Sequence, residues 1–244
     1  FREVFNFAAG RPAEPGSVFK AVTLTTLLED GKVNLEDKLP TNHGRMDDMS
    51  KINQDNYITS YENKNKTSVI PIIDGFKISS NYVFRRLVKD HYGENPERFI
   101  DRLHAYNFGE AYEFELSESG SASPRIPDPS NTGWSIYDLV SVAIGYSARV
   151  TPLQVATFYN AIANDGKMMK PYVVESIEKN GKVIQKFDPV ILNGSICSKA
   201  TADTLTRALK MVTLEGTASK LKNSKCIVAG KTGTSRIHLS TEER

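Results

Sequence analysis

The chain contains residues whose types and spacing could support acyl transfer. Ser17 follows a Pro-Gly pair, and Lys20 lies three positions further on. Residues three apart on a helix share a face, with Cβ atoms about 5–6 Å apart, so the Lys20 amine can reach the Ser17 hydroxyl. A lysine that burial and a second cation keep neutral can accept the hydroxyl proton. The pair therefore predicts a serine nucleophile with a lysine as its base.

The Ser-x-x-Lys spacing alone does not exclude a simpler interpretation. Serine caps helices well after a turn, and Lys20 would then be a solvated residue of the first helical turn. The spacing also arises by chance, because Ser219 and Lys222 form a second match in a polar stretch. At this point Ser17 as a helix cap stays open.

Two further motifs favour chemistry over capping. Ser79-Ser80-Asn81 is the only Ser-x-Asn in the chain, and Lys231-Thr232-Gly233 is the only Lys-Thr-Gly. The order Ser-x-x-Lys, Ser-x-Asn, Lys-Thr-Gly is the triple found in class A β-lactamases and penicillin-binding proteins. Lys231 is the natural second cation, although a lysine can also protect an exposed edge strand, and flexible glycines are common in strands.

The motifs lie on elements that could position them. Apolar residues at helical spacing predict a mostly buried helix over 17–28, which Asp30-Gly31 ends. The Ser-x-Asn motif precedes an amphipathic helix over 82–90, and CIVAGKTGTSRI, residues 226–237, is typical of a strand. Three helices, a hairpin and two irregular regions complete the pattern: helices over 96–106, 151–165 and 199–214, the hairpin turn at Asn180-Gly181, a polar surface excursion over 41–67 and an ordered loop over 117–133. Helices interleaved with antiparallel strands indicate an α+β or α/β fold.

Composition excludes several function classes. The 244 residues fit one large domain or two small ones. The chain has 31 Lys and Arg against 29 Asp and Glu, and no basic block suggests nucleic acid or an anionic membrane. Cys197 and Cys226 lack a CxxC partner and the four histidines are scattered, so we expect no metal site. No apolar run approaches the ~18 residues of a membrane span.

With these motifs, three longer stretches make the chain resemble the transpeptidase domain of penicillin-binding proteins, most closely the class B, cell-division type. The stretches are EPGSVFK, ASPRIPDP and IGYSARVTPLQVATFYNAIANDGKMMKP. The resemblance implies a β-lactamase/transpeptidase-like α+β fold, an α/β sandwich in which helices flank an antiparallel sheet beside a mostly helical subdomain. It covers almost all of residues 1–244. We expect a single domain truncated at both ends, without membrane anchor, pedestal domain, C-terminal strands or terminal helix.

The resemblance also implies a role for each motif residue in catalysis. Ser17 would be the nucleophile and Lys20 the general base. Ser79 would carry a proton between Lys20 and Lys231 toward the leaving amine. The backbone N–H groups of Ser17 and Thr234 would form the oxyanion hole.

Substrate binding follows from the same resemblance. Asn81 would hydrogen-bond the substrate peptide, and the hydroxyls of Thr232 and Thr234 would hold its terminal carboxylate. Gly233 would let the substrate backbone approach the strand edge closely. No cofactor is implied.

The implied activity is a D-Ala-D-Ala transpeptidase. Ser17 would attack the stem peptide, D-alanine would leave, and an amine of a neighbouring stem peptide would resolve the acyl-enzyme into a crosslink. β-Lactams would acylate the same serine. The full-length protein would be anchored in the cytoplasmic membrane with this domain outside, among divisome membrane proteins as partners and in septal cell-wall synthesis.

Three alternatives remain on sequence grounds. A serine β-lactamase would bring water to the same acyl-enzyme, but the Glu-x-x-Leu-Asn motif of class A enzymes is absent from the sequence. A D-Ala-D-Ala carboxypeptidase differs only in the acceptor. A β-lactam sensor or inert scaffold would bind without turnover.

Overall fold

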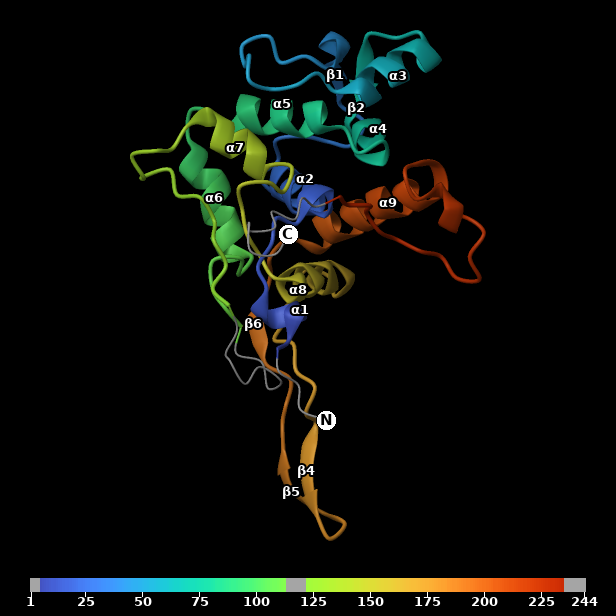
Figure 1. The fold of residues 1–244 in the computed structure, drawn as a ribbon. Helices are drawn as coiled ribbons and strands as arrows, with labels where there is room; N and C mark the ends of the chain where they lie inside the picture. Colours follow the sequence, from blue (N-terminus) through green and yellow to red (C-terminus); the bar gives the residue numbers. More distant parts are fainter. Residues whose placement is uncertain (1–4, 113–121, 235–244) are drawn as a thin grey trace.

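The structure, a computed structural model, describes residues 5–112 and 122–234 as helices with small antiparallel sheets (Figure 1). The α-helices are α1 (Phe7–Gly10), α2 (Lys20–Glu29), α3 (Asn56–Asn65), α4 (Ile72–Lys77), α5 (Asn81–Tyr92), α6 (Pro96–Ala105), α7 (Ile136–Val142), α8 (Pro152–Ala163) and α9 (Lys199–Glu215). The 3-10 helices are η1 (Gly16–Phe19), η2 (Asn42–Gly44) and η3 (Ser219–Leu221). Residues 117–121 of the expected loop and 235–237 of the expected strand lie outside the described residues.

The described strands pair two by two. They are β1 (Lys38–Pro40), β2 (Val69–Pro71), β3 (Met168–Met169), β4 (Ser176–Lys179), β5 (Lys182–Lys186) and β6 (Ile191–Asn193). Antiparallel pairs join β1 to β2, β3 to β6 and β4 to β5, with Leu39 opposite Ile70 in the first pair. The α+β class expected from the sequence is confirmed. In the part of the chain described, the strands form three two-stranded sheets.

Helix α2 lies at the centre of the molecule, in contact with α5, α6 and α9 (Figure 1). Its apolar side chains are fully buried, among them Leu24 and Leu27, and Phe19 just before it is buried too. Most of the buried apolar residues, from Phe19 to Val212, form one continuous cluster. The helix that bears Lys20 is therefore held on several sides by the core.

Local sequence signals located several elements correctly. Thr151 caps α8, accepting a hydrogen bond from the Gln154 amide at 3.2 Å, with Pro152 at the first helical position. The turn between β4 and β5 has positive φ at both Asn180 and Gly181, as a type I′ hairpin requires. Helix α9 spans the range expected from its periodicity.

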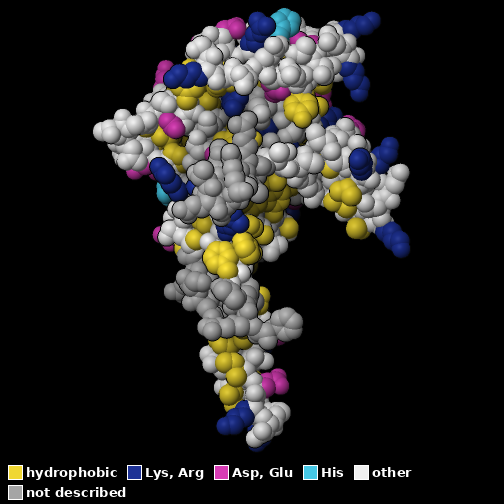
Figure 2. All heavy atoms as spheres, in the orientation of Figure 1, with side chains coloured by type: hydrophobic (Ala, Val, Ile, Leu, Met, Phe, Trp, Pro, Cys, Tyr) yellow, Lys and Arg dark blue, Asp and Glu magenta, His cyan; other side chains and the backbone are white. Residues whose placement is uncertain are grey.

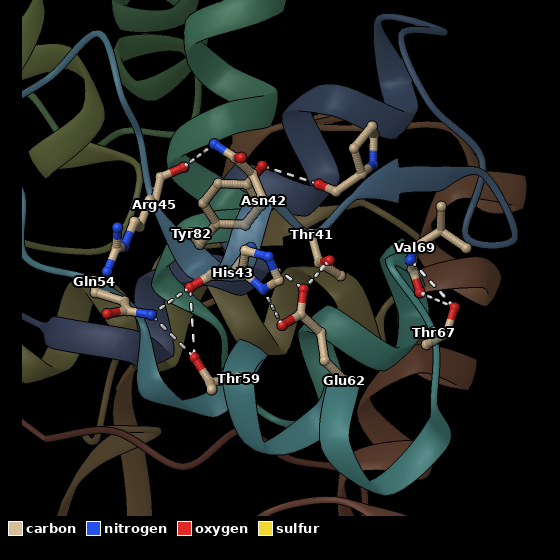
Figure 3. A network of polar contacts seen from close by, with 11 residues as sticks. Thr41, Asn42, His43, Arg45, Gln54, Thr59, Glu62, Thr67, Val69 and Tyr82 are labelled. Atoms are coloured by element: carbon tan, nitrogen blue, oxygen red, sulfur yellow. Dashed lines mark hydrogen bonds and ion pairs between the residues drawn. The ribbon is translucent and has the colours of Figure 1, made fainter.

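The prediction of a surface excursion over 41–67 was wrong for its second half. Asp55 caps α3, and Ile58 is fully buried. Glu62, also on α3, accepts hydrogen bonds from the Thr41 hydroxyl and, at 3.3 Å, from the His43 amide (Figure 3). The polar sequence masks this helix because its buried face is stabilised largely by hydrogen bonds rather than by apolar side chains.

The strand expected around Lys231 is also corrected. Residues 227–234 form no regular element, and no strand among the described residues pairs with them. They follow α9 instead: the Gly230 amide donates to the Leu209 carbonyl at 3.3 Å, and the Thr213 hydroxyl donates to the Val228 carbonyl at 2.6 Å. A short apolar run favours a strand, but a strand forms only where a neighbouring backbone completes its hydrogen bonds.

The β4–β5 hairpin projects far from the helical body (Figure 1). Apolar side chains line it on the face shown in Figure 2. Ile177, Val183 and Ile184 are exposed. The hairpin lies at the opposite end of the molecule from α3 and α5, so it does not position the motif residues.

Candidate active site

A tight turn before α2 positions Ser17. Gly16 has φ +61° and donates its amide to the Gly145 carbonyl at 2.9 Å. Gly145 has φ +83°, and a Cβ there would lie 2.0 Å from the Gly16 oxygen, so only glycine fits. The Tyr159 hydroxyl donates to the Val18 carbonyl at 2.8 Å and fixes the other side of the turn.

Ser17 is not a helix cap in this fold. It lies inside η1, whose cap is Pro15, while α2 begins after Phe19, and neither helix start has a side-chain capping hydrogen bond. The capping interpretation of Ser17 is therefore excluded. Ser219 and Lys222, the second Ser-x-x-Lys pair, are exposed around η3 and do not line the pocket described below.

The Ser-x-Asn motif is built around the start of α5. Ser80 is buried and caps the helix, accepting a hydrogen bond from the Val83 amide at 3.1 Å and donating to Asp55 at 2.8 Å. Ser79 has φ +59°, which turns the chain sharply just before the helix. Asn81 is the first helical residue. The middle residue of the motif thus anchors the two residues that could perform chemistry.

Ser79 joins the two motif lysines. Lys20 Nζ donates to the Ser79 carbonyl at 2.6 Å and lies 3.2 Å from Ser79 Oγ. Lys231 Nζ donates to Ser79 Oγ at 2.7 Å. Among the described residues, no hydrogen bond joins Lys20 to the Ser17 hydroxyl. The sequence prediction that Ser79 bridges two amines agrees with this arrangement, and the amine of Lys20 is oriented by Ser79 rather than by Ser17.

Burial makes Lys20 a candidate base. Its side chain is fully buried, and Nζ lies 5.9 Å from the centre of the Phe84 ring. Desolvation, followed by repulsion from Lys231, holds the pKa of Lys20 well below its ordinary value of 10.5. Both causes favour the neutral amine, which has the lone pair that a base requires.

Lys231 is less completely buried. Its Nζ lies 5.8 Å from the centre of the Phe76 ring, and desolvation lowers its pKa to about 8. Near neutral pH, Lys231 is therefore the amine that keeps its proton. The Ser79 hydroxyl thus lies between two amines whose pKa values are both lowered by burial, an arrangement suited to proton transfer.

A pocket of about 290 Å³ opens beside these amines. It is lined by the predicted site residues Ser17, Ser79, Asn81, Thr232, Gly233 and Thr234. Gly233 passes close to the serine turn, since a Cβ there would lie 2.7 Å from Val18 Cγ1. Lys20 and Lys231 are not in the pocket lining but meet its wall at Ser79. The fold thus brings together the seven residues selected from the three motifs and Thr234, which the resemblance added.

Three further lining residues had no motif to mark them: Tyr57, Tyr146 and Thr217. Thr217 Oγ1 lies 2.6 Å from Thr232 Oγ1, so it orients a hydroxyl expected to contact substrate. Tyr57 comes from the start of α3, a helix that no sequence pattern predicted. No local signal places these side chains at the pocket, because each arrives there through a long-range contact.

Other kinds of site find no support in the described residues. In residues 5–112 and 122–234, no three histidine, cysteine or acidic side chains are arranged to hold a metal ion. Cys197 is buried and Cys226 is exposed, each as a free thiol. None of the described helices is both long and apolar enough to cross a membrane.

Comparison with known proteins agrees with this geometry. The family model described as the penicillin-binding protein transpeptidase domain matches residues 3–243. The chain belongs to this family. Two transpeptidase-family relatives extend the match: penicillin-binding protein PbpB of Mycolicibacterium smegmatis is 28% identical over 96% of this chain, and the peptidoglycan D,D-transpeptidase FtsI homolog of Mesostigma viride is 26% identical over 92%.

The fold agrees as well. The D,D-transpeptidase domain of a peptidoglycan glycosyltransferase from Eggerthella lenta superposes with a TM-score of 0.80 at 26% identity, covering 96% of this chain and 57% of that one. The chain spans 35% of the length of the PbpB protein and 39% of the FtsI homolog. Residues 3–243 thus correspond to one penicillin-binding transpeptidase region of proteins that are considerably longer.

Proposed function

We propose that this chain is the acyl-transfer domain of a peptidoglycan D,D-transpeptidase and that β-lactams acylate it at Ser17. The observation that supports this most directly is the hydrogen-bonded series from Lys20 through Ser79 to Lys231 beside a pocket lined by Ser17. A neutral amine, a bridging hydroxyl and a charged amine are the groups that serine acylation without histidine needs.

The first step forms the acyl-enzyme. Neutral Lys20 takes the Ser17 hydroxyl proton as Ser17 Oγ attacks the carbonyl of the D-Ala-D-Ala bond. Ser79 relays a proton from the amine pair to the nitrogen of the departing D-alanine, and the C–N bond breaks. Lys231, charged at neutral pH, assists by donating to Ser79 Oγ.

The second step resolves the acyl-enzyme. An amine of a second stem peptide attacks the ester carbonyl and loses a proton to the Lys20 amine through the same hydroxyl. The new C–N bond forms the crosslink, the ester C–O bond breaks, and Ser17 Oγ regains its proton. The site returns to its starting protonation without any added cofactor.

The other motif residues are assigned to binding. The backbone N–H groups of Ser17 and Thr234 would stabilise the oxyanion, each worth about 10²–10³ in rate. Asn81, at the amino end of α5, would bind the peptide. The hydroxyls of Thr232, which contacts Thr217, and of Thr234 would hold the terminal carboxylate.

The cellular role follows from the substrate. Because peptidoglycan stem peptides lie outside the cytoplasmic membrane, the catalytic domain of the full-length protein would face outward from that membrane. The similarity to a peptidoglycan D,D-transpeptidase FtsI homolog supports a role in wall synthesis. The class B resemblance of the motifs implies that this role is at cell division, with divisome membrane proteins as partners. One continuous core supports a single domain over these residues.

The test is the intact mass of the protein after incubation with benzylpenicillin, with peptide mapping over several hours. We expect one stable adduct on Ser17, which Ser17→Ala abolishes and Ser219→Ala, in the second Ser-x-x-Lys pair, leaves in place. Rapid loss of the adduct with hydrolysis of the antibiotic would indicate a β-lactamase instead. Folded protein without an adduct would refute the proposal.

A further inference from the structure

A second, larger cavity of about 750 Å³ adjoins the Ser17 pocket. The two share Tyr57, Asn81 and Tyr146 in their linings. A ligand that reaches the serine can therefore extend past Asn81 into the second cavity. None of the three catalytic motifs assigns a function to this space, whose other lining residues include Glu14, Lys51 and Arg85.

Arg85 is the unusual residue of this cavity. It lies on α5 one helical turn after Asn81, and the two side chains share a helix face. Its Nε is buried and has no hydrogen-bond partner among the described residues. A buried donor without an acceptor is costly, and a charged one more so. Arg85 also lines the cavity and makes no side-chain hydrogen bond with another described residue, so its guanidinium can donate to an anionic ligand there.

The neighbouring acids do not fill that role by hydrogen bonding. Asp55 Oδ1 accepts from the Tyr57 amide at 3.0 Å, and Oδ2 accepts from the Ser80 hydroxyl at 2.8 Å and the Tyr82 amide at 2.9 Å. Asp55 thus attracts Arg85 only at a distance, while its oxygens hold the starts of α3 and α5. Glu14, the other lining acid, accepts from the Ser147 amide at 2.9 Å.

A second cation lines the same cavity. Lys51 Nζ lies 5.5 Å from the centre of the Tyr137 ring, and the Lys51 residue is exposed. The lining thus has two cations, Lys51 and Arg85, and two carboxylates whose oxygens accept hydrogen bonds from backbone amides. A planar carboxylate is the group that a guanidinium binds best, through two parallel hydrogen bonds.

We propose that this cavity, the Arg85 cavity, binds a carboxylate of a stem peptide, with the Arg85 guanidinium as its principal donor. The inference rests on the proposed function for the identity of the ligand. The carboxylate could belong to the donor strand that acylates Ser17 or to the acceptor strand whose amine resolves the acyl-enzyme. Both have the same chemistry, and the arms of the experiment separate them.

The first measurement is calorimetric binding of a stem-peptide fragment that lacks the terminal D-alanine, prepared with its side-chain carboxylate free or amidated. In the wild type we expect the free carboxylate to lower Kd about 10-fold or more relative to the amide, the usual worth of a hydrogen bond to a charged group. In Arg85→Gln the ratio falls to near one. Arg86→Gln, which removes the exposed arginine paired with Asp90, keeps the wild-type ratio. A change in folding or in overall affinity alters the Kd of both peptides equally, so it cancels in the ratio of the two Kd values.

The second measurement assigns the strand. A free-carboxylate preference in kcat/KM for acylation by a depsipeptide donor, lost in Arg85→Gln, assigns the donor. The acceptor is tested with amines that have a free or an amidated carboxylate. If the free-carboxylate amine raises the ratio of aminolysis to hydrolysis, and Arg85→Gln abolishes this preference, the carboxylate belongs to the acceptor.

The two proposals can fail separately. If the protein binds the free-carboxylate peptide through Arg85 but forms no acyl-enzyme with benzylpenicillin or the depsipeptide, the proposed function fails and the carboxylate site stands. If the wild type does not distinguish the free from the amidated peptide, or if Arg85→Gln keeps the distinction, the Arg85 cavity is not a carboxylate site, whatever the penicillin result.

Discussion

Two buried polar clusters of this molecule differ in whether their ionisable groups have hydrogen-bond partners that stabilise the charged form. In the amine cluster, two lysine amines, Lys20 and Lys231, meet at the Ser79 hydroxyl, and neither is hydrogen-bonded to a carboxylate among the described residues. In the glutamate cluster, one carboxylate, that of Glu62, is bonded by the Thr41 hydroxyl and lies 2.8 Å from His43 Nδ1 (Figure 3).

The pKa shifts express the difference. Desolvation dominates at Lys20 and lowers its pKa, away from the charged form. At Glu62 desolvation acts to raise the pKa, but the bonds from Thr41 and His43 outweigh it and the pKa falls. A buried charge that is fully hydrogen-bonded, such as that of Glu62, remains ionised and stabilises the fold. Buried amines without a carboxylate partner, such as Lys20 and Lys231, lose a proton more readily. The contrast predicts that substitutions in the first cluster change chemistry and substitutions in the second change stability.

The largest expected effect is that of Lys20→Met. Removing the base while filling the same buried space should slow acylation by benzylpenicillin about 10²–10⁴-fold. The free energy of unfolding should change by less than about 1.5 kcal/mol, because relief of the buried amine offsets loss of its bond to the Ser79 carbonyl. Stopped-flow acylation and urea unfolding measure the two quantities.

Lys199→Met is the matched control for that substitution, because Lys199 lies in an exposed ion pair on α9. It should leave the acylation rate unchanged. If Lys20→Met acylated at the wild-type rate, or lost most of its stability, the amine cluster would be structural and the contrast would be broken.

The next effect is the pH dependence of acylation. As pH rises through about 8, Lys231 loses its proton, and the rate should fall about tenfold per unit above that pH. On the acid side, the rate should fall as Lys20 becomes protonated. Lys231→Arg keeps a charge at all these pH values, so the alkaline decline should vanish even if the overall rate is lower. A decline of the same shape in both proteins would mean that another group titrates.

The smallest effect is that of Glu62→Gln, which should cost about 1–3 kcal/mol of stability and leave the acylation rate unchanged. The lowered pKa means that Glu62 contributes stability above its ordinary value of 4.5 and loses it as pH falls through its folded value. The substitution should therefore remove part of the acid sensitivity. Thermal melts from pH 3 to 7 test this, with the exposed, ion-paired Glu36→Gln as control. A slower acylation in Glu62→Gln would link the two clusters.

The amino-acid sequence by itself determined what depends on short-range chemistry. The order of three motifs selected Ser17, Lys20, Ser79, Asn81 and Lys231 to Gly233, and the family resemblance added Thr234. The Thr151 cap predicted the start of α8, and the Asn180-Gly181 turn predicted the β4–β5 hairpin. Both signals act within a few residues. The family resemblance that these motifs carry also predicted the α+β class of the fold.

Only the tertiary structure decided the rest. Helix α3 forms from a polar stretch because Glu62 pairs with Thr41 and His43. Residues 227–234 have an irregular backbone that is hydrogen-bonded to α9 through Leu209 and Thr213. The Lys20 amine is oriented by Ser79, 59 positions away in the chain. The unpartnered Nε of Arg85 depends on which amides Asp55 already accepts. A sequence states which groups are present, but burial and long-range pairing decide which remain unsatisfied, and those are the groups available for chemistry.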